Sequence, residues 1–99
     1  MLSLQITPKA EQDLSEIFEY TFHKWGIIQA EKYQDELFNS MQLILENKEI
    51  GKAYPYFKRE YRKLHINRHL IFYKIESKNC IIVRILHDSV DIRKQLKTK

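Results

Sequence analysis

The chain has 99 residues, of which 43% are hydrophobic and 12% aromatic, and this size predicts one domain over residues 1–99. Its single cysteine, Cys80, argues against a secreted domain held by disulfides. The sequence has no run of about 18 apolar residues, and its first residues lack the basic start and apolar stretch of a signal peptide, so we expect none. We therefore expect a soluble, cytoplasmic protein with no membrane partner; its net charge is +4.

The N-terminal segment predicts a short strand followed by a helix. Apolar and polar residues alternate over residues 2–7, as in a half-buried strand. Thr7 is a suitable N-cap and Pro8 suits the first helical position, so a helix is expected to begin there. Apolar residues then recur at helical spacing as far as Trp25, and Gly26 is a residue that commonly ends a helix.

A second helix is predicted over residues 28–47, before Gly51. Because the connection between the two helices is very short, they must lie antiparallel as a helical hairpin. Three aromatic residues of the hairpin are expected in its core, namely Phe18, Trp25 and Tyr33, whereas Phe22 is harder to bury.

The second half predicts three strands, over residues 60–66, 69–76 and 80–87, joined by turns of hairpin length. Residues 89–96 form either a short helix or a tail. The predicted fold is therefore α+β, with the order β-α-α-β-β-β and an antiparallel sheet that carries the helical hairpin on one face. The other face is either covered or a binding surface, and four aromatic residues near it are harder to bury: Tyr54, Tyr56, Phe57 and Tyr61.

Charge is divided unevenly along the chain. Residues 1–50 contain nine acidic residues and four lysines, whereas residues 51–99 contain thirteen lysines and arginines and four acidic residues. This division favours a basic surface for an acidic partner or a nucleic acid. Solvated acids on helices and lysines on strand edges would give the same division.

Cleavage of RNA needs a general base, a cation for the phosphate and a general acid. Candidate side chains are present in the second half: Arg62, Lys63, His65, Arg68, His69, Tyr73, Arg84 and His87. Strand alternation places Arg84 and His87 on opposite faces unless the strand bulges or ends between them, which disfavours a dyad. An arginine amid apolar residues needs a fixed partner, either a structural carboxylate such as Asp91 or a ligand.

No metal site or cofactor site is predicted. His65 and His69 span a turn without an acidic ligand nearby, and one cysteine does not make a structural zinc site. The two glycines stand far apart, which excludes a glycine-rich phosphate loop. Cys80 lies in an apolar stretch and is expected to be buried and inert.

Four stretches together resemble the ParE toxins of bacterial toxin–antitoxin operons, within the RelE/ParE superfamily, over nearly the whole chain. They are AEQDLSEIFEYTFHKWGIIQAEKY (residues 10–33), NKEIGKAY (47–54), YRKLHINRHLIFYKI (61–75) and IIVRILHDSVD (81–91). The resemblance implies the β-α-α-β-β-β architecture and a toxin made beside a ParD-like antitoxin, whose acidic C-terminal segment wraps over it. It also implies inhibition of DNA gyrase, and operator binding by the toxin–antitoxin complex through the antitoxin.

The resemblance leaves two activities open. We expect a gyrase inhibitor without enzymatic activity, and the alternative is a RelE-like ribosome-dependent endoribonuclease that would use Lys63, Arg84 and His87. In either case we expect the partner-binding residues to be Arg59, Arg62, Lys63, Arg68, Tyr73, Arg84, His87 and Asp91.

Overall fold

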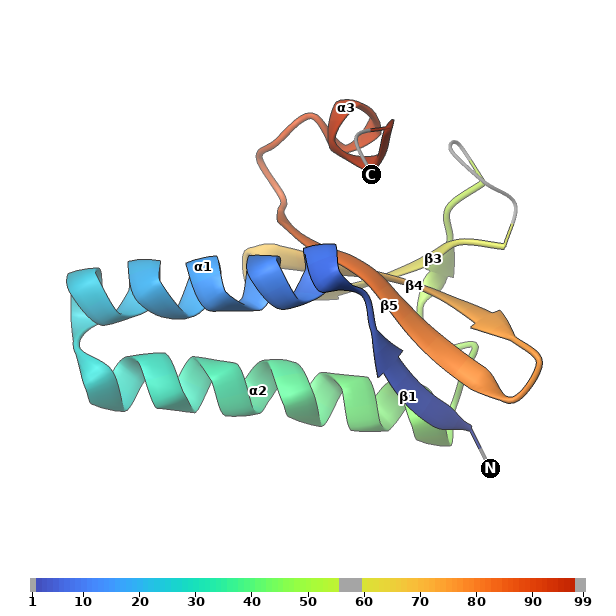
Figure 1. Ribbon diagram of the computed structural model, residues 1–99, viewed down its shortest axis with the longest axis horizontal. Coiled ribbons are helices and arrows are strands. Elements are labelled where there is room, and N and C mark those ends of the chain that lie inside the picture. Colours follow the sequence, from blue (N-terminus) through green and yellow to red (C-terminus); the bar gives the residue numbers. More distant parts are fainter. Residues whose placement is uncertain (1, 56–59, 98–99) are drawn as a thin grey trace.

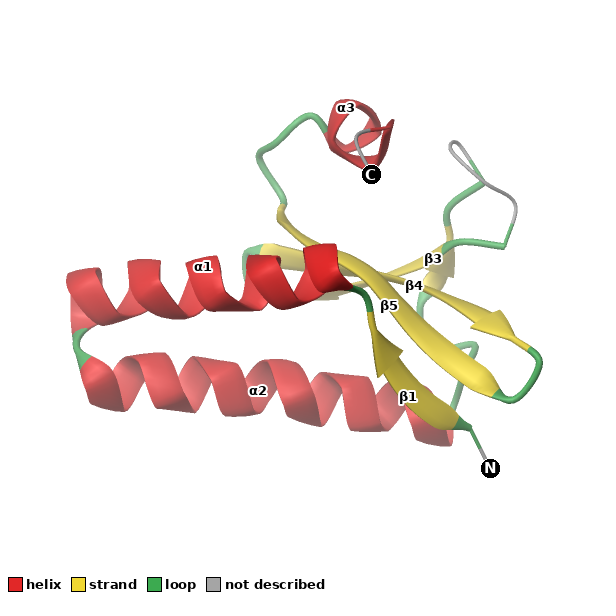
Figure 2. Ribbon diagram, in the orientation of Figure 1, coloured by secondary structure: helices red, strands yellow, loops and turns green. Residues whose placement is uncertain are grey.

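The computed structural model describes residues 2–55 and 60–97 and has an α+β fold with a helical hairpin on one face of a sheet, as predicted. A short C-terminal helix lies on the opposite side of the sheet (Figures 1 and 2). The elements in chain order are β1 (Ser3–Ile6), α1 (Pro8–Trp25), α2 (Ile27–Glu46), β2 (Lys52–Ala53), β3 (Arg62–Ile66), β4 (His69–Glu76), β5 (Asn79–His87) and α3 (Ile92–Lys97).

The sheet has five strands in the order β1-β5-β4-β3-β2 and is mixed rather than wholly antiparallel. β3, β4 and β5 form the predicted antiparallel meander. β1 instead pairs in parallel with β5, with Ser3 opposite Asn79 and Ile6 opposite Ile82. The helical hairpin returns the chain to its starting side, so the first strand can lie beside the last. β2 has only two residues, too few to produce a periodic pattern in the sequence.

The predicted helix boundaries are confirmed. Thr7 caps α1, because its Oγ1 accepts a hydrogen bond from Ala10 N at 3.1 Å. The same hydroxyl donates to Val83 O at 2.9 Å, which attaches the start of α1 to β5. Gly26 alone separates α1 from α2 and has φ +96°, a conformation that favours glycine.

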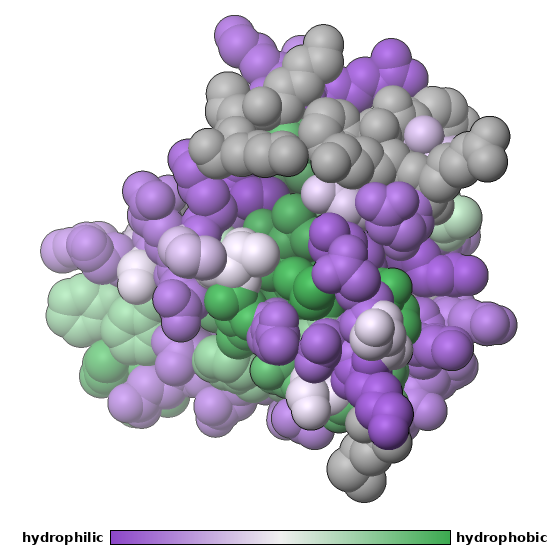
Figure 3. Space-filling model, turned by 45° about the vertical axis from the view of Figure 1, so that its right-hand side comes forward, coloured by the Kyte–Doolittle hydropathy of each residue, from purple (hydrophilic) through white to green (hydrophobic). Residues whose placement is uncertain are grey.

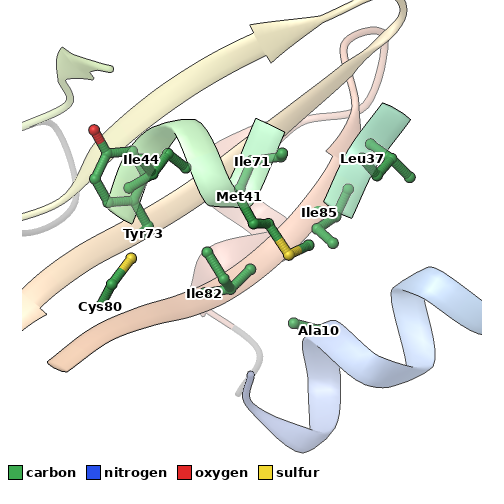
Figure 4. Close-up of a cluster of buried hydrophobic side chains, with 9 residues drawn as sticks. All are labelled: Ala10, Leu37, Met41, Ile44, Ile71, Tyr73, Cys80, Ile82 and Ile85. Atoms are coloured by element: carbon green, nitrogen blue, oxygen red, sulfur yellow. The ribbon is translucent and has the colours of Figure 1, made fainter. Parts of the chain in front are cut away.

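The main core lies between the helical hairpin and the sheet (Figure 4). Its buried side chains come from both helices and from β4 and β5, namely Ala10, Leu37, Met41, Ile44, Ile71, Tyr73, Cys80, Ile82 and Ile85. Burial raises the pKa of the Cys80 thiol to about 11, in keeping with the expected inert cysteine. Trp25 was wrongly assigned to the core: it is 65% exposed, because the end of the hairpin extends beyond the sheet (Figure 1).

The opposite face of the sheet is covered in part by α3, which decides between a helix and a tail for the C-terminal segment. Leu96 of α3 is buried in a second apolar cluster that includes Phe72 and Leu86. Tyr54 and Tyr61 also belong to this cluster, so the expectation that they resist burial was wrong. The other two aromatic residues of that expectation, Tyr56 and Phe57, lie outside the described residues.

β5 contains an irregularity that changes its alternation. Tyr73 pairs with Ile82 and Phe72 pairs with Arg84, which leaves Val83 without a partner in the register. Ile85 therefore packs in the same core cluster as Ile82, although regular alternation would place these two residues on opposite faces. Cys80 and Ile82, before the bulge, therefore share a face of the sheet with Ile85, after it, whereas regular alternation predicted that Ile85 would lie on the other face.

Tyr73 joins the sheet to the connection after α2. Its fully buried hydroxyl donates to Lys48 O at 2.8 Å and accepts from Gly51 N at 2.9 Å. A Cβ on Gly51 would lie 2.7 Å from the Tyr73 ring, so only glycine fits here. Arg62 adds a third bond, from its Nη1 to Gly51 O at 2.7 Å. Because Tyr73 is buried, we withdraw it from the partner-binding set and assign it a structural role.

Replacing Tyr73 by Phe tests this attachment. The change leaves the buried Gly51 N–H without its acceptor, so the free energy of unfolding should fall by about 1–3 kcal/mol. Urea denaturation of Tyr73→Phe and of the exposed control Tyr20→Phe measures this loss. Equal stability of the two variants would show that the hydroxyl does not hold the connection.

Candidate functional site

Arg84 forms a buried ion pair with Asp13 of α1. Its Nε donates to Asp13 Oδ2 at 2.8 Å and its Nη2 donates to Asp13 Oδ1 at 3.0 Å. The side chains of Arg84 and Asp13 are only 11% and 9% exposed. The hydrogen bonds that Arg84 donates to Asp13 are the main cause that raises the pKa of Arg84, so the guanidinium stays charged. The remaining Nη1 donates to Gln95 O of α3 at 3.1 Å, so this one side chain joins α1, β5 and α3.

The expected partner of Arg84, Asp91, was wrong. Asp91 is exposed, and its Oδ1 accepts a hydrogen bond from Lys94 N at 3.3 Å, at the start of α3. Asp13 lies 71 positions from Arg84 in the sequence, whereas Asp91 is seven positions away. The sequence pattern pointed to Asp91 because it is close to Arg84 along the chain, whereas the contact with Asp13 depends on the fold.

Asp13 lies beside Arg84 because α1 follows the edge of β5 after β1 has ended. β1 pairs with β5 only as far as Ile82, so the next backbone groups of β5 lack a strand neighbour on that side. Asp13 supplies an acceptor there, because its Oδ2 also accepts from Ile85 N at 2.9 Å. The carboxylate thus accepts three hydrogen bonds. One of them satisfies the Ile85 amide, which has no neighbouring strand to bond to at this edge of the sheet.

A group of charged and titratable side chains gathers around Asp88, just after β5. Asp88 Oδ2 lies 3.4 Å from His65 Nε2, and Asp88 Oδ1 lies 3.4 Å from Arg68 Nε and 3.5 Å from His87 Nδ1. The backbone supports this geometry, since Asp88 N donates to Arg68 O at 2.8 Å. Three side chains, from β3, from the turn between β3 and β4, and from the end of β5, therefore meet at one carboxylate.

His87 also contacts His69, its neighbour in the register between β4 and β5. The two imidazole rings meet edge to face at 5.3 Å, and the Tyr33 hydroxyl of α2 lies 2.7 Å from His69 Nδ1. Burial, and then the nearby His87, lower the pKa of His69. Sequence reasoning missed this pair, although opposite positions in a predicted antiparallel hairpin could have indicated it.

The three predicted nuclease residues contact different partners. Arg84 is bound to Asp13 and reaches α3, whereas His87 contacts His69 beside α2, so the two point to opposite faces as expected. The Lys63 ammonium lies 5.2 Å from the centre of the Tyr54 ring. Arg59 of the predicted partner-binding set lies outside the described residues.

An open groove of about 1160 Å³ separates the end of the helical hairpin from the ends of the strands. α1 and α2 form one wall, and the turn between β3 and β4 forms the other together with the end of β5. Arg68, His69, Arg84 and His87 all line it, while Lys63 and His65 do not. Arg68 is highly exposed in this region, with 71% of its side chain accessible to solvent.

Residues 2–55 and 60–97 contain no group of three or more His, Cys, Asp or Glu side chains placed to hold a metal ion. Within the same residues, neither long helix is apolar enough over its length to cross a membrane.

The sequence and the fold are both similar to those of known proteins. A family model of the ParE toxin of type II toxin–antitoxin systems, parDE, matches residues 4–92. The chain is 35% identical to Toxin ParE1 of Mycobacterium tuberculosis over 92 residues, which is 92% of this chain and 94% of that toxin. It is 29% identical to Toxin ParE1 of Caulobacter vibrioides over 96 residues, which is 97% and 99% of the two chains. A chain of the chromosomal ParDE system from P. aeruginosa has the same fold, with a TM-score of 0.77 at 22% identity, over 88% of this chain and 96% of that chain.

Replacement of Asp13 by Ala should destabilise the protein strongly. The change leaves the Arg84 guanidinium buried without its carboxylate and leaves Ile85 N without an acceptor, so the free energy of unfolding should fall by about 3–5 kcal/mol. Guanidinium denaturation measures this loss against Glu19→Ala, an exposed acid on the same helix. A loss below 1 kcal/mol for Asp13→Ala would contradict the structural role of the pair.

His69 should make stability dependent on pH. Its pKa is lowered in the folded chain, so below pH 6.5 the unfolded chain binds more protons at this site. The contribution of neutral His69 is complete above pH 6.5 and is lost as the pH falls through the folded pKa. Melting temperatures between pH 7.5 and 5 should fall less steeply in His69→Gln than in the unchanged chain, whereas the exposed control His23→Gln should leave the slope as it is. Parallel slopes for His69→Gln and the unchanged chain would refute this assignment.

Proposed function

We propose that this chain, which belongs to the ParE toxin family of type II toxin–antitoxin systems, arrests growth by binding DNA gyrase and is neutralised by a ParD-like antitoxin. Family membership follows from the match of the ParE toxin model to residues 4–92 and from the 35% identity to a curated ParE1 toxin. The proposal places the action in the cytoplasm, where gyrase works on DNA.

The observation that carries a non-enzymatic mechanism is the bond between Arg84 and Asp13. A cation that stabilises a phosphate in a transition state must direct its donors at the substrate. Arg84 instead directs two donors at Asp13 and a third at Gln95 O. His87 lines the same groove as Arg84 but contacts His69, and Lys63 lies outside the groove, so the geometry supports binding better than chemistry.

The proposed antitoxin contact uses the charge of the second half of the chain. An acidic C-terminal segment of the antitoxin would be attracted to the excess of lysine and arginine over residues 51–99. Among the expected contact residues, Arg68 is highly exposed and His87 is 42% exposed, while Arg62 and Lys63 are half-buried. Binding of operator DNA would belong to the antitoxin within the complex.

One observation favours a second candidate, the RelE-like endoribonuclease. The His69 and His87 rings meet at 5.3 Å beside Arg68, so two imidazoles and a cation lie in one groove. Two such imidazoles can act as general base and general acid in phosphodiester cleavage. This set shares only His87 with the nuclease set of Lys63, Arg84 and His87, although Arg68 and His69 were among the wider candidates for RNA cleavage.

A pair of assays decides between the two functions. Purified toxin should inhibit supercoiling by gyrase and accumulate cleaved DNA, while translation in a cell-free extract stays intact. His87→Ala should retain gyrase inhibition within about threefold, since the mechanism needs no proton transfer. If the toxin leaves gyrase untouched and cuts messenger RNA, with a loss of about 10²–10⁴-fold in His87→Ala, the endoribonuclease replaces the gyrase inhibitor.

A further inference from the structure

The end of the helical hairpin is unusually apolar for a surface. Of nine large hydrophobic side chains exposed within residues 2–55 and 60–97, five lie between positions 20 and 28. These five, named here the hairpin-end patch, are Tyr20, Phe22, Trp25, Ile27 and Ile28. Figure 3 shows hydrophobic surface at the left, where the hairpin ends, among hydrophilic atoms. Clustered exposed apolar side chains in a small protein mark a surface that binds a partner.

The surface of α1 beside this patch carries an acid, an aromatic ring and a base at equal spacing. Glu16, Tyr20 and Lys24 are four residues apart, so they follow one another in a single row along the helix. All three are exposed and all three line the groove. At the rise of an α-helix, Glu16 lies about 6 Å before Tyr20 along the axis and Lys24 lies about 6 Å after it. Opposite charges therefore stand at equal distances on either side of one ring.

Neither charge of this row is neutralised within residues 2–55 and 60–97. Glu16 Oε2 accepts a hydrogen bond from Gln12 Nε2 at 3.1 Å, and Lys24 Nζ donates to the Tyr20 hydroxyl at 3.2 Å. No ion pair of the described residues includes either side chain. The Lys24 ammonium also lies 5.6 Å from the centres of the Tyr20 and Trp25 rings and holds them in place. Rings that are already fixed lose little conformational entropy when a partner packs on them.

A second copy of α1 is complementary to this row when the two helices run antiparallel. A two-fold axis at Tyr20 places Glu16 of each copy opposite Lys24 of the other, so the same attraction occurs twice. Parallel helices would instead place Glu16 against Glu16 and Lys24 against Lys24, which repels. The rest of the groove is also mixed in sign, since Lys32 and Glu36 of α2 line it. Glu16 and Glu36 would repel the phosphates of a nucleic acid, so this surface suits a protein of mixed charge.

The exposed area is close to what a dimer of this size needs. A specific interface buries about 800 Å² on each partner, and an aromatic side chain can contribute about 150–250 Å². Tyr20 is 63% exposed, Trp25 is 65% exposed and Ile28 is 80% exposed. These three side chains supply roughly half of the required area, and the aliphatic stems of Glu16 and Lys24 add to it.

We propose that two copies of this chain associate through antiparallel α1 helices, with Tyr20 at the two-fold axis, a Glu16–Lys24 pair on each side of it and Trp25 buried at each end. The proposal goes beyond the proposed function and does not depend on it, because its evidence is the row of side chains on α1. The dimer covers part of the hairpin-end patch in the free protein. Any other partner that needs this surface must first separate the two copies.

Sedimentation equilibrium of the full-length chain, from micromolar to submillimolar concentration, measures the association. The mass should rise from 12.1 kDa toward twice that value. Trp25 is the single tryptophan of the sequence, so its emission should shift to shorter wavelength over the same concentrations as water leaves the ring. A mass that stays at 12.1 kDa over the whole range would overturn the proposal.

Charge exchange locates the interface. Glu16→Lys alone sets two lysines opposite each other on both sides of the axis, and Lys24→Glu alone does the same with two glutamates. Each variant should therefore dimerise about tenfold or more weakly than the unchanged chain. An equimolar mixture of the two variants restores opposite charges at both positions, so it should form a mixed dimer within about threefold of the original affinity.

Two control variants change the net charge by the same amounts outside the groove. Glu19 and Lys78 are exposed and do not line it, so Glu19→Lys and Lys78→Glu should change the affinity less than about twofold. Circular dichroism confirms that each variant is folded.

The outcomes separate this proposal from the proposed function. A dimer whose affinity is unchanged in Glu16→Lys and Lys24→Glu, or single variants that do not recover when mixed, would move the association to another surface and overturn the proposal. A monomer whose Trp25 emission shifts only when gyrase or a single-stranded oligonucleotide is added would assign the surface to that partner instead. Gyrase inhibition is measured separately on the unchanged chain, so failure of the dimer leaves the proposed function intact.

Discussion

The buried ion pair between Asp13 and Arg84 is the constraint on which the arrangement of the helices depends. β5 loses its parallel neighbour after Ile82, and the Asp13 carboxylate then satisfies both the Ile85 amide and the Arg84 guanidinium. The third guanidinium bond, to Gln95 O, fixes α3 on the opposite side of the sheet. One interaction therefore positions α1 and α3 against the same strand. Breaking the ion pair would leave a buried charge without its partner, which is strongly destabilising.

The same pair shapes the functional proposal. A guanidinium that is fully engaged with a carboxylate and a carbonyl is poorly placed to bind a phosphate, which favours a toxin that acts by binding. Exposed apolar side chains gather at the end of the helical hairpin, and exposed charged side chains gather around Asp88. Apolar anchors at the first and charges at the second are the usual components of a protein-binding surface. The toxin would thus keep a rigid centre and offer its partners the groove between these two regions.

The sequence allowed much of the fold to be predicted, because the signals for it are local. Thr7, Pro8 and Gly26 mark helix ends through their own backbone chemistry, and the three C-terminal strands follow from short apolar runs between turns. The parallel pairing of β1 with β5 and the bond between Asp13 and Arg84 join segments more than 70 residues apart, and no local pattern encodes them. Trp25 was misplaced for a related reason: helical spacing identifies an apolar stripe but not where the underlying sheet stops.

The central claim is that Arg84 holds the fold and takes no direct part in toxicity. The double variant Asp13→Asn/Arg84→Gln tests it most directly, because it removes both charges together and keeps an acceptor for Ile85 N. The measurement is the supercoiling of DNA by gyrase in the presence of the folded variant, at a temperature well below the variant's melting transition. We predict inhibition within about threefold of the unchanged chain, because the contact surface is preserved. A threefold change corresponds to less than about 1 kcal/mol of binding free energy, since 1.4 kcal/mol corresponds to a tenfold change. Complete loss of inhibition in a variant that remains folded would contradict the claim and place Arg84 in the toxic interaction itself.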